Sequence, residues 1–196
     1  MTKFSFFTDF KTPRERKNFI EIMDIIKSGV YKTEIDLLRS KIASNNSKEA
    51  SIIKSKLHSF TPSGVFEGAR NGDSLAAYSN VLHLDFDKLT QEQIDELKNS
   101  LRPDSSVLAF CVSPSGNGLK VFFRINDTAL KHTMNMKNLF RYVRLKWGFL
   151  PDEQCIDLPR LCFMSYDPEA YFNAEAKLFS YSIDDSVKEA FQFTEA

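Results

Sequence analysis

Residues 81–87, VLHLDFD, decide how the rest of the chain is interpreted. Apolar residues at positions 82, 84 and 86 alternate with polar ones, which is typical of a β-strand that has one face in a core. The opposite face carries His83, Asp85 and Asp87. Two carboxylates therefore point the same way from one strand, although like charges repel and aspartate is depleted in strands. The stretch predicts a strand that carries a functional site.

The overall composition and the N-terminal sequence argue against some classes of protein, and we expect the protein to be cytoplasmic. Twenty-six basic and 26 acidic residues cancel, so no global field attracts nucleic acid or membrane, although a local basic groove stays compatible with this balance. Cys111, Cys155 and Cys162 form no CxxC pair and are expected to be reduced thiols rather than a disulfide framework or a zinc site. The N-terminus lacks the apolar segment of a signal peptide, and no apolar run of membrane-spanning length occurs.

The N-terminal part, residues 1–58, is expected to be a mainly helical subregion packed on the core. After a short strand over 3–8, the residues T12-P-R-E15 resemble a capping box and predict the start of a helix that ends at Gly29. Apolar stripes predict two more helices before residue 58.

The remaining residues, 59–196, show a regular alternation of elements that predicts one integrated α+β domain. The expected elements are a strand over 81–87, a helix over 90–101, a hairpin of strands over 107–113 and 119–125, a helix over 128–147 and a strand over 161–165. This βαββαβ order is typical of ferredoxin-like folds and of the RNA-recognition motif (RRM). In that topology the first and third strands lie side by side and helices cover one face, so Asp85 and Asp87 would share the open face with Lys120, Phe122 and Arg124.

The pair Asp85 and Asp87 suits a hard divalent cation, because each carboxylate offers oxygen ligands and the cation removes their repulsion. A DxD pattern is short, and a solvated strand end carrying two acids explains it equally well. The position on a central strand favours the functional interpretation.

The turn between the hairpin strands is the second candidate. Ser113, Ser115, Gly116 and Gly118 would expose hydroxyls and backbone N–H groups, which a phosphate cradle needs, and Lys120 follows within reach. The alternative is an ordinary hairpin turn with a solvated lysine after it.

The segment 152–168, DEQCIDLPRLCFMSYDP, is the third candidate. Asp157 and Arg160 stand just before the last expected strand, where a third carboxylate could complete a two-metal site and an arginine could hold phosphate or template. They could equally be a turn cap and its surface partner.

Taken together, these three segments resemble the archaeo-eukaryotic primase superfamily, also known as primase-polymerases. Its DxD, its Gly-rich hairpin motif and its later hydrophobic-Asp correspond to HLDFD, SPSGNGLK and CIDLPR in this sequence. More narrowly, FTPSGVFEGARN, LHLDFD, SPSGNGLKVFFRI and RLCFMSYDP resemble the N-terminal domain of virulence-associated protein E-like proteins of Bacteroidetes.

The resemblance implies a metal-dependent nucleotidyltransferase that synthesises or extends primers in DNA replication, including that of mobile elements. It implies Mg²⁺ or Mn²⁺ as cofactor, nucleoside triphosphates and a single-stranded DNA or RNA template as partners, and a helicase-like ATPase domain, fused or separate. The implied catalytic and metal-binding residues are Asp85, Asp87 and Asp157. The implied nucleotide-binding residues are Ser113, Ser115, Gly116, Gly118, Lys120, Arg124 and Arg160. The superfamily commonly has histidine where this chain has Lys120, and a lysine exchanges protons near neutral pH only if its pKa is strongly lowered.

Two other functions remain open from the sequence. One is a non-catalytic module that binds single-stranded nucleic acid on the same sheet, with Phe122 stacking on a base. The other is a regulatory or structural domain with an accidental DxD. If the acids are functional, replacing Asp85 or Asp87 by alanine is expected to leave the fold intact and to stabilise it slightly.

Overall fold

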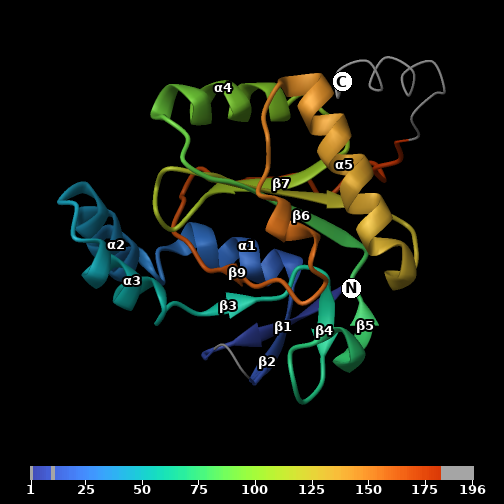
Figure 1. Ribbon diagram of the computed structural model, residues 1–196, viewed down its shortest axis with the longest axis horizontal. Helices are drawn as coiled ribbons and strands as arrows, with labels where there is room; N and C mark the ends of the chain where they lie inside the picture. Colours follow the sequence, from blue (N-terminus) through green and yellow to red (C-terminus); the bar gives the residue numbers. More distant parts are fainter. Residues whose placement is uncertain (1, 10–11, 182–196) are drawn as a thin grey trace, which may run out of the picture.

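The computed structural model describes residues 2–9 and 12–181, which form a mixed α/β structure with antiparallel sheets (Figure 1). Helices α4 and α5 lie on one side of a sheet that includes β6 and β7, and α1 and a second sheet lie on the other side. The helices are α1 (Phe19–Ser28), α2 (Lys32–Ala43), α3 (Ser47–Lys54), α4 (Gln91–Leu101) and α5 (His132–Trp147).

The first sheet has the strand order β10-β7-β8-β6. Its strands are β6 (Val81–Phe86), β7 (Val107–Val112), β8 (Leu119–Arg124) and β10 (Tyr171–Phe172). Strands β6 and β8 are antiparallel neighbours, as predicted, and Asp85 lies directly opposite Lys120. Cross-strand neighbours of this kind lie close enough for their side chains to interact.

The helix-covered face of this sheet agrees with the prediction from strand alternation. Its buried side chains from β6 and β8 are Leu82, Leu84, Phe86, Leu119, Val121 and Phe123, and they pack against apolar residues of α4 and α5. The predicted capping box of α4 is present, because Thr90 and Gln93 each bond the other's backbone N–H. Gly148 ends α5 in the left-handed conformation, with a φ of 73°.

The other face of the first sheet is covered, which corrects the expectation of an open face. A second sheet, with the order β2-β1-β3-β9, packs there together with α1. Its strands are β1 (Lys3–Phe7), β2 (Glu15–Asn18), β3 (Ser59–Phe60) and β9 (Cys162–Phe163). Phe122 is fully buried between the layers and contacts Phe19 and Phe60.

The strand over 161–165 was expected to complete a ferredoxin-like sheet, and the ferredoxin-like core is not confirmed. Within this segment only Cys162–Phe163 form a strand, β9, which pairs with β3 of the second sheet, and β10 joins the first sheet next to β7. After α5 the chain runs through Pro151 and the short 3₁₀ helix η3 (Glu153–Ile156), and it then pairs with β3 of the second sheet as β9.

The helix expected to begin at T12-P-R-E15 begins later. Residues from Glu15 to Asn18 form β2, and the capping box that starts α1 is made by Asn18 and Glu21. The predicted end at Gly29 is confirmed, with a φ of 82°.

Three smaller features complete the description. Helices α2 and α3 pack on each other beside α1, and β4 (Gly64–Phe66) and β5 (Leu75–Tyr78) pair as an antiparallel hairpin. The other 3₁₀ segments are η1 (Gly72–Ser74) and η2 (Ala129–Lys131). Within the described ranges, no helix combines the length and the apolar character that crossing a bilayer requires.

Candidate functional site

A cleft with a volume of about 310 Å³ is lined by residues at the adjoining ends of β6 and β8 and by Phe163 of β9. Asp85, Asp87 and Lys120 lie in it together with Ser113 and Ser115 of the hairpin turn. The remaining lining residues are Lys54, Arg70, Pro114, Asp152, Arg160, Leu161 and Phe163. The cleft therefore combines three carboxylates, four cationic side chains and an apolar wall.

Lys120 and Asp85 form the innermost ion pair of the cleft. The Lys120 Nζ donates to Asp85 Oδ2 at 2.6 Å, and the side chains are 5% and 21% exposed, respectively. Burial alone would raise the pKa of Asp85, but the charge of Lys120 and its hydrogen bond outweigh burial and hold that pKa below its usual value. Burial would likewise lower the pKa of Lys120, but Asp85 raises it above its usual value. Lys120 is thus a fixed cation and not a group that exchanges protons near neutral pH.

The second oxygen of Asp85 distinguishes this pair from a simple structural ion pair. Asp85 Oδ1 is buried and has no hydrogen-bond partner within the described part of the chain. Buried acceptors are normally satisfied, and an unsatisfied one indicates strain, a site for an ion or another function. The atom lies in a cleft of carboxylates, where a cation would satisfy it.

Asp87 lies at the mouth of the cleft, two residues after Asp85. Asp87 is exposed as a whole, but its carboxylate is partly desolvated. This desolvation and the nearby charge of Asp85 both raise its pKa. A cation bound between the two carboxylates would relieve this repulsion. Asp85 and Asp87 therefore fit a divalent cation by chemistry and by position, although no three His, Cys, Asp or Glu side chains cluster as a ready ligand set in residues 2–9 and 12–181.

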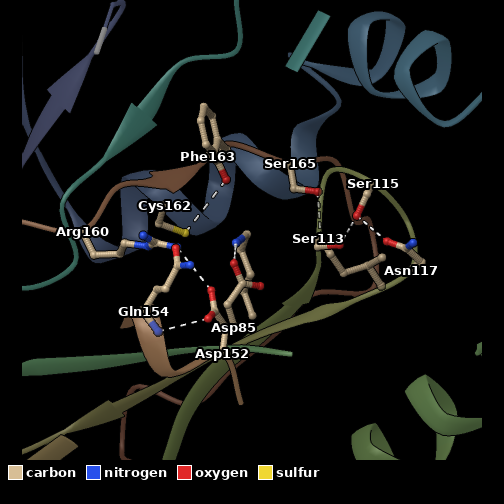
Figure 2. Close-up of polar contacts among 12 residues, drawn as sticks. Asp85, Ser113, Ser115, Asn117, Asp152, Gln154, Arg160, Cys162, Phe163 and Ser165 are labelled. Carbon is tan, nitrogen blue, oxygen red and sulfur yellow. Dashed lines mark hydrogen bonds and ion pairs between the residues drawn. The ribbon is translucent and has the colours of Figure 1, made fainter. Parts of the chain in front are cut away.

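The third carboxylate of the cleft is Asp152 and not Asp157. The backbone N–H of Asp152 donates to the Asp85 carbonyl at 2.7 Å, which fixes the residue beside β6. Arg160 donates to Asp152 Oδ2 at 3.2 Å and to Gln154 Oε1 at 2.9 Å. Figure 2 shows Arg160, Asp152 and Gln154 gathered next to Asp85. Asp157 is exposed and lines a neighbouring small cavity, which is separate from the cleft although Arg160 borders both.

The hairpin turn at the other side of the cleft is built by side-chain and backbone hydrogen bonds. The Ser113 and Ser115 hydroxyls lie 2.9 Å apart, and the Ser115 hydroxyl donates to Asn117 Oδ1 at 2.6 Å (Figure 2). Gly118 has no room for a side chain, because a Cβ there would lie 2.3 Å from the Phe86 carbonyl oxygen. The turn is therefore pressed against the end of β6, next to Asp87.

Arg39 of α2 holds the turn in place from the N-terminal region. Its guanidinium donates to the carbonyls of Pro114, Ser113 and Tyr166 at 3.1–3.3 Å. Gly116, with a φ of 82°, lies against this guanidinium. The sequence did not predict a role for Arg39, because that role depends on contacts with residues more than 70 positions away.

The remaining predicted residue, Arg124, lies away from the cleft. It sits at the far end of β8, where its guanidinium donates to the Ala176 carbonyl at 2.5 Å, and it borders a different cavity. His83 is buried, stacks on Phe122 with ring centroids 5.1 Å apart and has a pKa lowered by burial to about 3. His83 is therefore a neutral packing residue.

Comparisons with known proteins identify one family. A search of curated proteins finds no sequence that matches the chain. The primase-polymerase domain of cyanophage S-2L (its AEP domain) is similar in structure with a TM-score of 0.41 and 14% identity, over 63% of this chain and 65% of that one. Residues 52–172 match the family described as "BT4734-like, N-terminal domain", and this range contains every residue that lines the cleft. Since the match covers more than half of the sequence, the chain belongs to the BT4734-like N-terminal domain family.

Proposed function

We propose that the protein is a nucleotidyltransferase domain of the primase-polymerase type, which binds a nucleoside triphosphate and Mg²⁺ or Mn²⁺ in the cleft. One observation carries the proposal: Asp85 and Asp87 share the cleft with Lys120, Arg160 and the serine-lined turn. Oxygen ligands for a hard cation thus lie beside cationic groups and hydroxyls suited to phosphate. The order of these motifs along the chain, which resembles that of primase-polymerases, supports the same function.

The residues of the cleft divide into three roles. Asp85 and Asp87 would hold the divalent cation, which supplies charge neutralisation for phosphoryl chemistry when it is bound. Lys120 and Arg160 would orient the triphosphate, and the Ser113 and Ser115 hydroxyls would donate hydrogen bonds to it. Transfer of this kind requires positioning and electrostatic stabilisation rather than a covalent nucleophile.

The proposal also includes a biological role. The protein would synthesise or extend primers on a single-stranded template, next to a helicase-like ATPase, as in virulence-associated protein E-like proteins. The competing proposal of a non-catalytic module with Phe122 as a base-stacking platform is not favoured, because Phe122 is fully buried between the two sheets.

Titration of the full chain with a non-hydrolysable nucleoside triphosphate, with and without Mg²⁺ or Mn²⁺, tests the proposal. We expect binding that depends on the cation, and incorporation of labelled nucleotide on a single-stranded template. Asp87→Asn should weaken both, while Asp24→Asn, an exposed acid on α1, should leave both unchanged. Cation-independent binding, or full activity in the Asp87 variant, would contradict the proposal.

A further inference from the structure

The carboxylates of the cleft are unequally balanced by cationic side chains. Lys120 pairs with Asp85 and Arg160 pairs with Asp152. Asp87 makes no ion pair with any described residue, and Asp85 keeps one oxygen, Oδ1, without a partner. Ion pairs among the described residues therefore neutralise two of the three acids and leave Asp87 for an external charge.

Lys120 is held where it is by its surroundings. Its side chain is 5% exposed, and its backbone is fixed in the β6–β8 ladder directly opposite Asp85. Cys111 is its opposite neighbour on the other side, in β7, and is also buried. An ammonium group in this position is part of the interior, whereas Lys54 at the rim of the same cleft is exposed.

A cation added to this cleft has one favourable position. At Asp85 Oδ2 it would meet the Lys120 ammonium at hydrogen-bond distance, and like charges that close repel. At Asp85 Oδ1 it would satisfy a buried acceptor, and Asp87, which follows the end of β6 and lines the same cleft, could supply a second ligand.

We propose that the Lys120 ammonium occupies one of the two cation positions of a two-metal nucleotidyl-transfer site, so that the cleft takes a single divalent cation together with the triphosphate. The cation binds between Asp85 Oδ1 and Asp87, and Lys120 provides the second positive charge permanently. This inference rests on the proposed function and adds to it the number of cations.

Electron paramagnetic resonance of Mn²⁺, titrated into the full chain with a non-hydrolysable nucleoside triphosphate, counts the bound ions directly. We expect one Mn²⁺ per chain in the wild type. Two would overturn the inference and leave the proposed function standing, whereas no bound Mn²⁺ with or without nucleotide would overturn both.

A pair of lysine variants separates the ammonium of Lys120 from the general charge of the cleft. Lys120→Met should allow a second Mn²⁺ to bind, while Lys54→Met, which removes the same charge from the rim, should keep one. Equal counts in the two variants would overturn the inference. Thermal unfolding with and without Mn²⁺ serves as a second readout, because Mn²⁺ should raise the midpoint of Lys120→Met more than that of the wild type. If Lys120→Met does not fold, the wild-type count decides alone.

Discussion

Lys120 and Asp85 lie opposite each other in the β6–β8 ladder, and each neutralises the charge of the other in a largely buried position. Removing one partner of a buried pair leaves an uncompensated charge in the interior, which is strongly destabilising. This changes the expectation from sequence that either aspartate can be removed without harm. Asp87, which is exposed and whose charge is disfavoured by Asp85, still fits that expectation.

We therefore predict opposite effects on stability for the two aspartates. Asp85→Ala should lower the free energy of unfolding by about 3–5 kcal/mol, because Lys120 loses its partner. Asp87→Ala should change it by no more than about 0.5 kcal/mol or stabilise the protein slightly. Urea denaturation of both variants without added cation measures the difference, and equal midpoints would contradict the structural role of the pair.

His132 should make stability depend on pH. Its Nδ1 lies 2.9 Å from the Tyr78 hydroxyl, and burial lowers its pKa to about 4. The unfolded chain binds this proton near pH 6.5, so the contribution of neutral His132 is complete above that pH and is lost as the pH falls from 6.5 to about 4.

The variant His132→Asn tests this titration, because an amide can keep the contact with Tyr78 without taking up a proton. Between pH 7 and pH 5 the wild type should lose roughly 1–2 kcal/mol more of its free energy of unfolding than the variant. Parallel losses in both proteins would show that other groups cause the pH dependence.

At the scale of elements, strand and helix periodicity predicted most of what positions the site. Alternation in β6 and β8 gave the helix-facing residues correctly, and the Thr90–Gln93 box gave the start of α4. The start of α1 was wrong because a cap lies immediately before the first residue of the apolar stripe, which makes Asn18 and not Thr12 the capping residue.

The parts that the sequence did not predict depend on contacts between distant segments. Whether β9 pairs in the first or the second sheet is decided by the edge that β3 offers, about a hundred residues earlier. Asp152 reaches the cleft through a backbone hydrogen bond to Asp85, and no local pattern records that bond. The sequence therefore led to Asp157 as the third carboxylate, whereas Asp152 is the one that lines the cleft.

The hairpin turn provides a prediction at this scale. Gly118→Ala should destabilise the protein by about 1–3 kcal/mol, because the added Cβ would meet the Phe86 carbonyl oxygen and force the turn away from β6. Gly72→Ala, where a Cβ meets nothing within 4 Å, is the matched control and should lie within about 0.5 kcal/mol of the wild type. A Gly118 variant as stable as the control would mean that the turn is not pressed against β6.

For the molecule as a whole, the sequence predicted one integrated domain with residues 1–58 packed on residues 59–196. The second sheet takes β1 and β2 from before residue 58 and β3 and β9 from after it. Its core contains α1 residues packed against the face of β8 that carries Phe122. Neither part covers its apolar surface alone.

We therefore predict that a fragment of residues 59–196 does not fold on its own, and that the full chain unfolds in one transition. Circular dichroism and tryptophan fluorescence should report the same midpoint for the full chain. The fragment should bind a hydrophobic dye, because the face around Phe122 would be exposed. A fragment that melts cooperatively near the temperature of the full chain would contradict this prediction.

The pairing of β3 with β9 also determines when the second sheet can be completed during translation. Ser59 leaves the ribosome about a hundred residues before its partner Phe163. At the usual elongation rate of about 5–20 residues per second, this interval lasts roughly 5–20 s. Throughout it, the phenylalanine-rich strand β1 and its neighbour β3 lack the segment that completes their sheet. The emerging chain should therefore be a client of ribosome-associated chaperones until β9 has been translated.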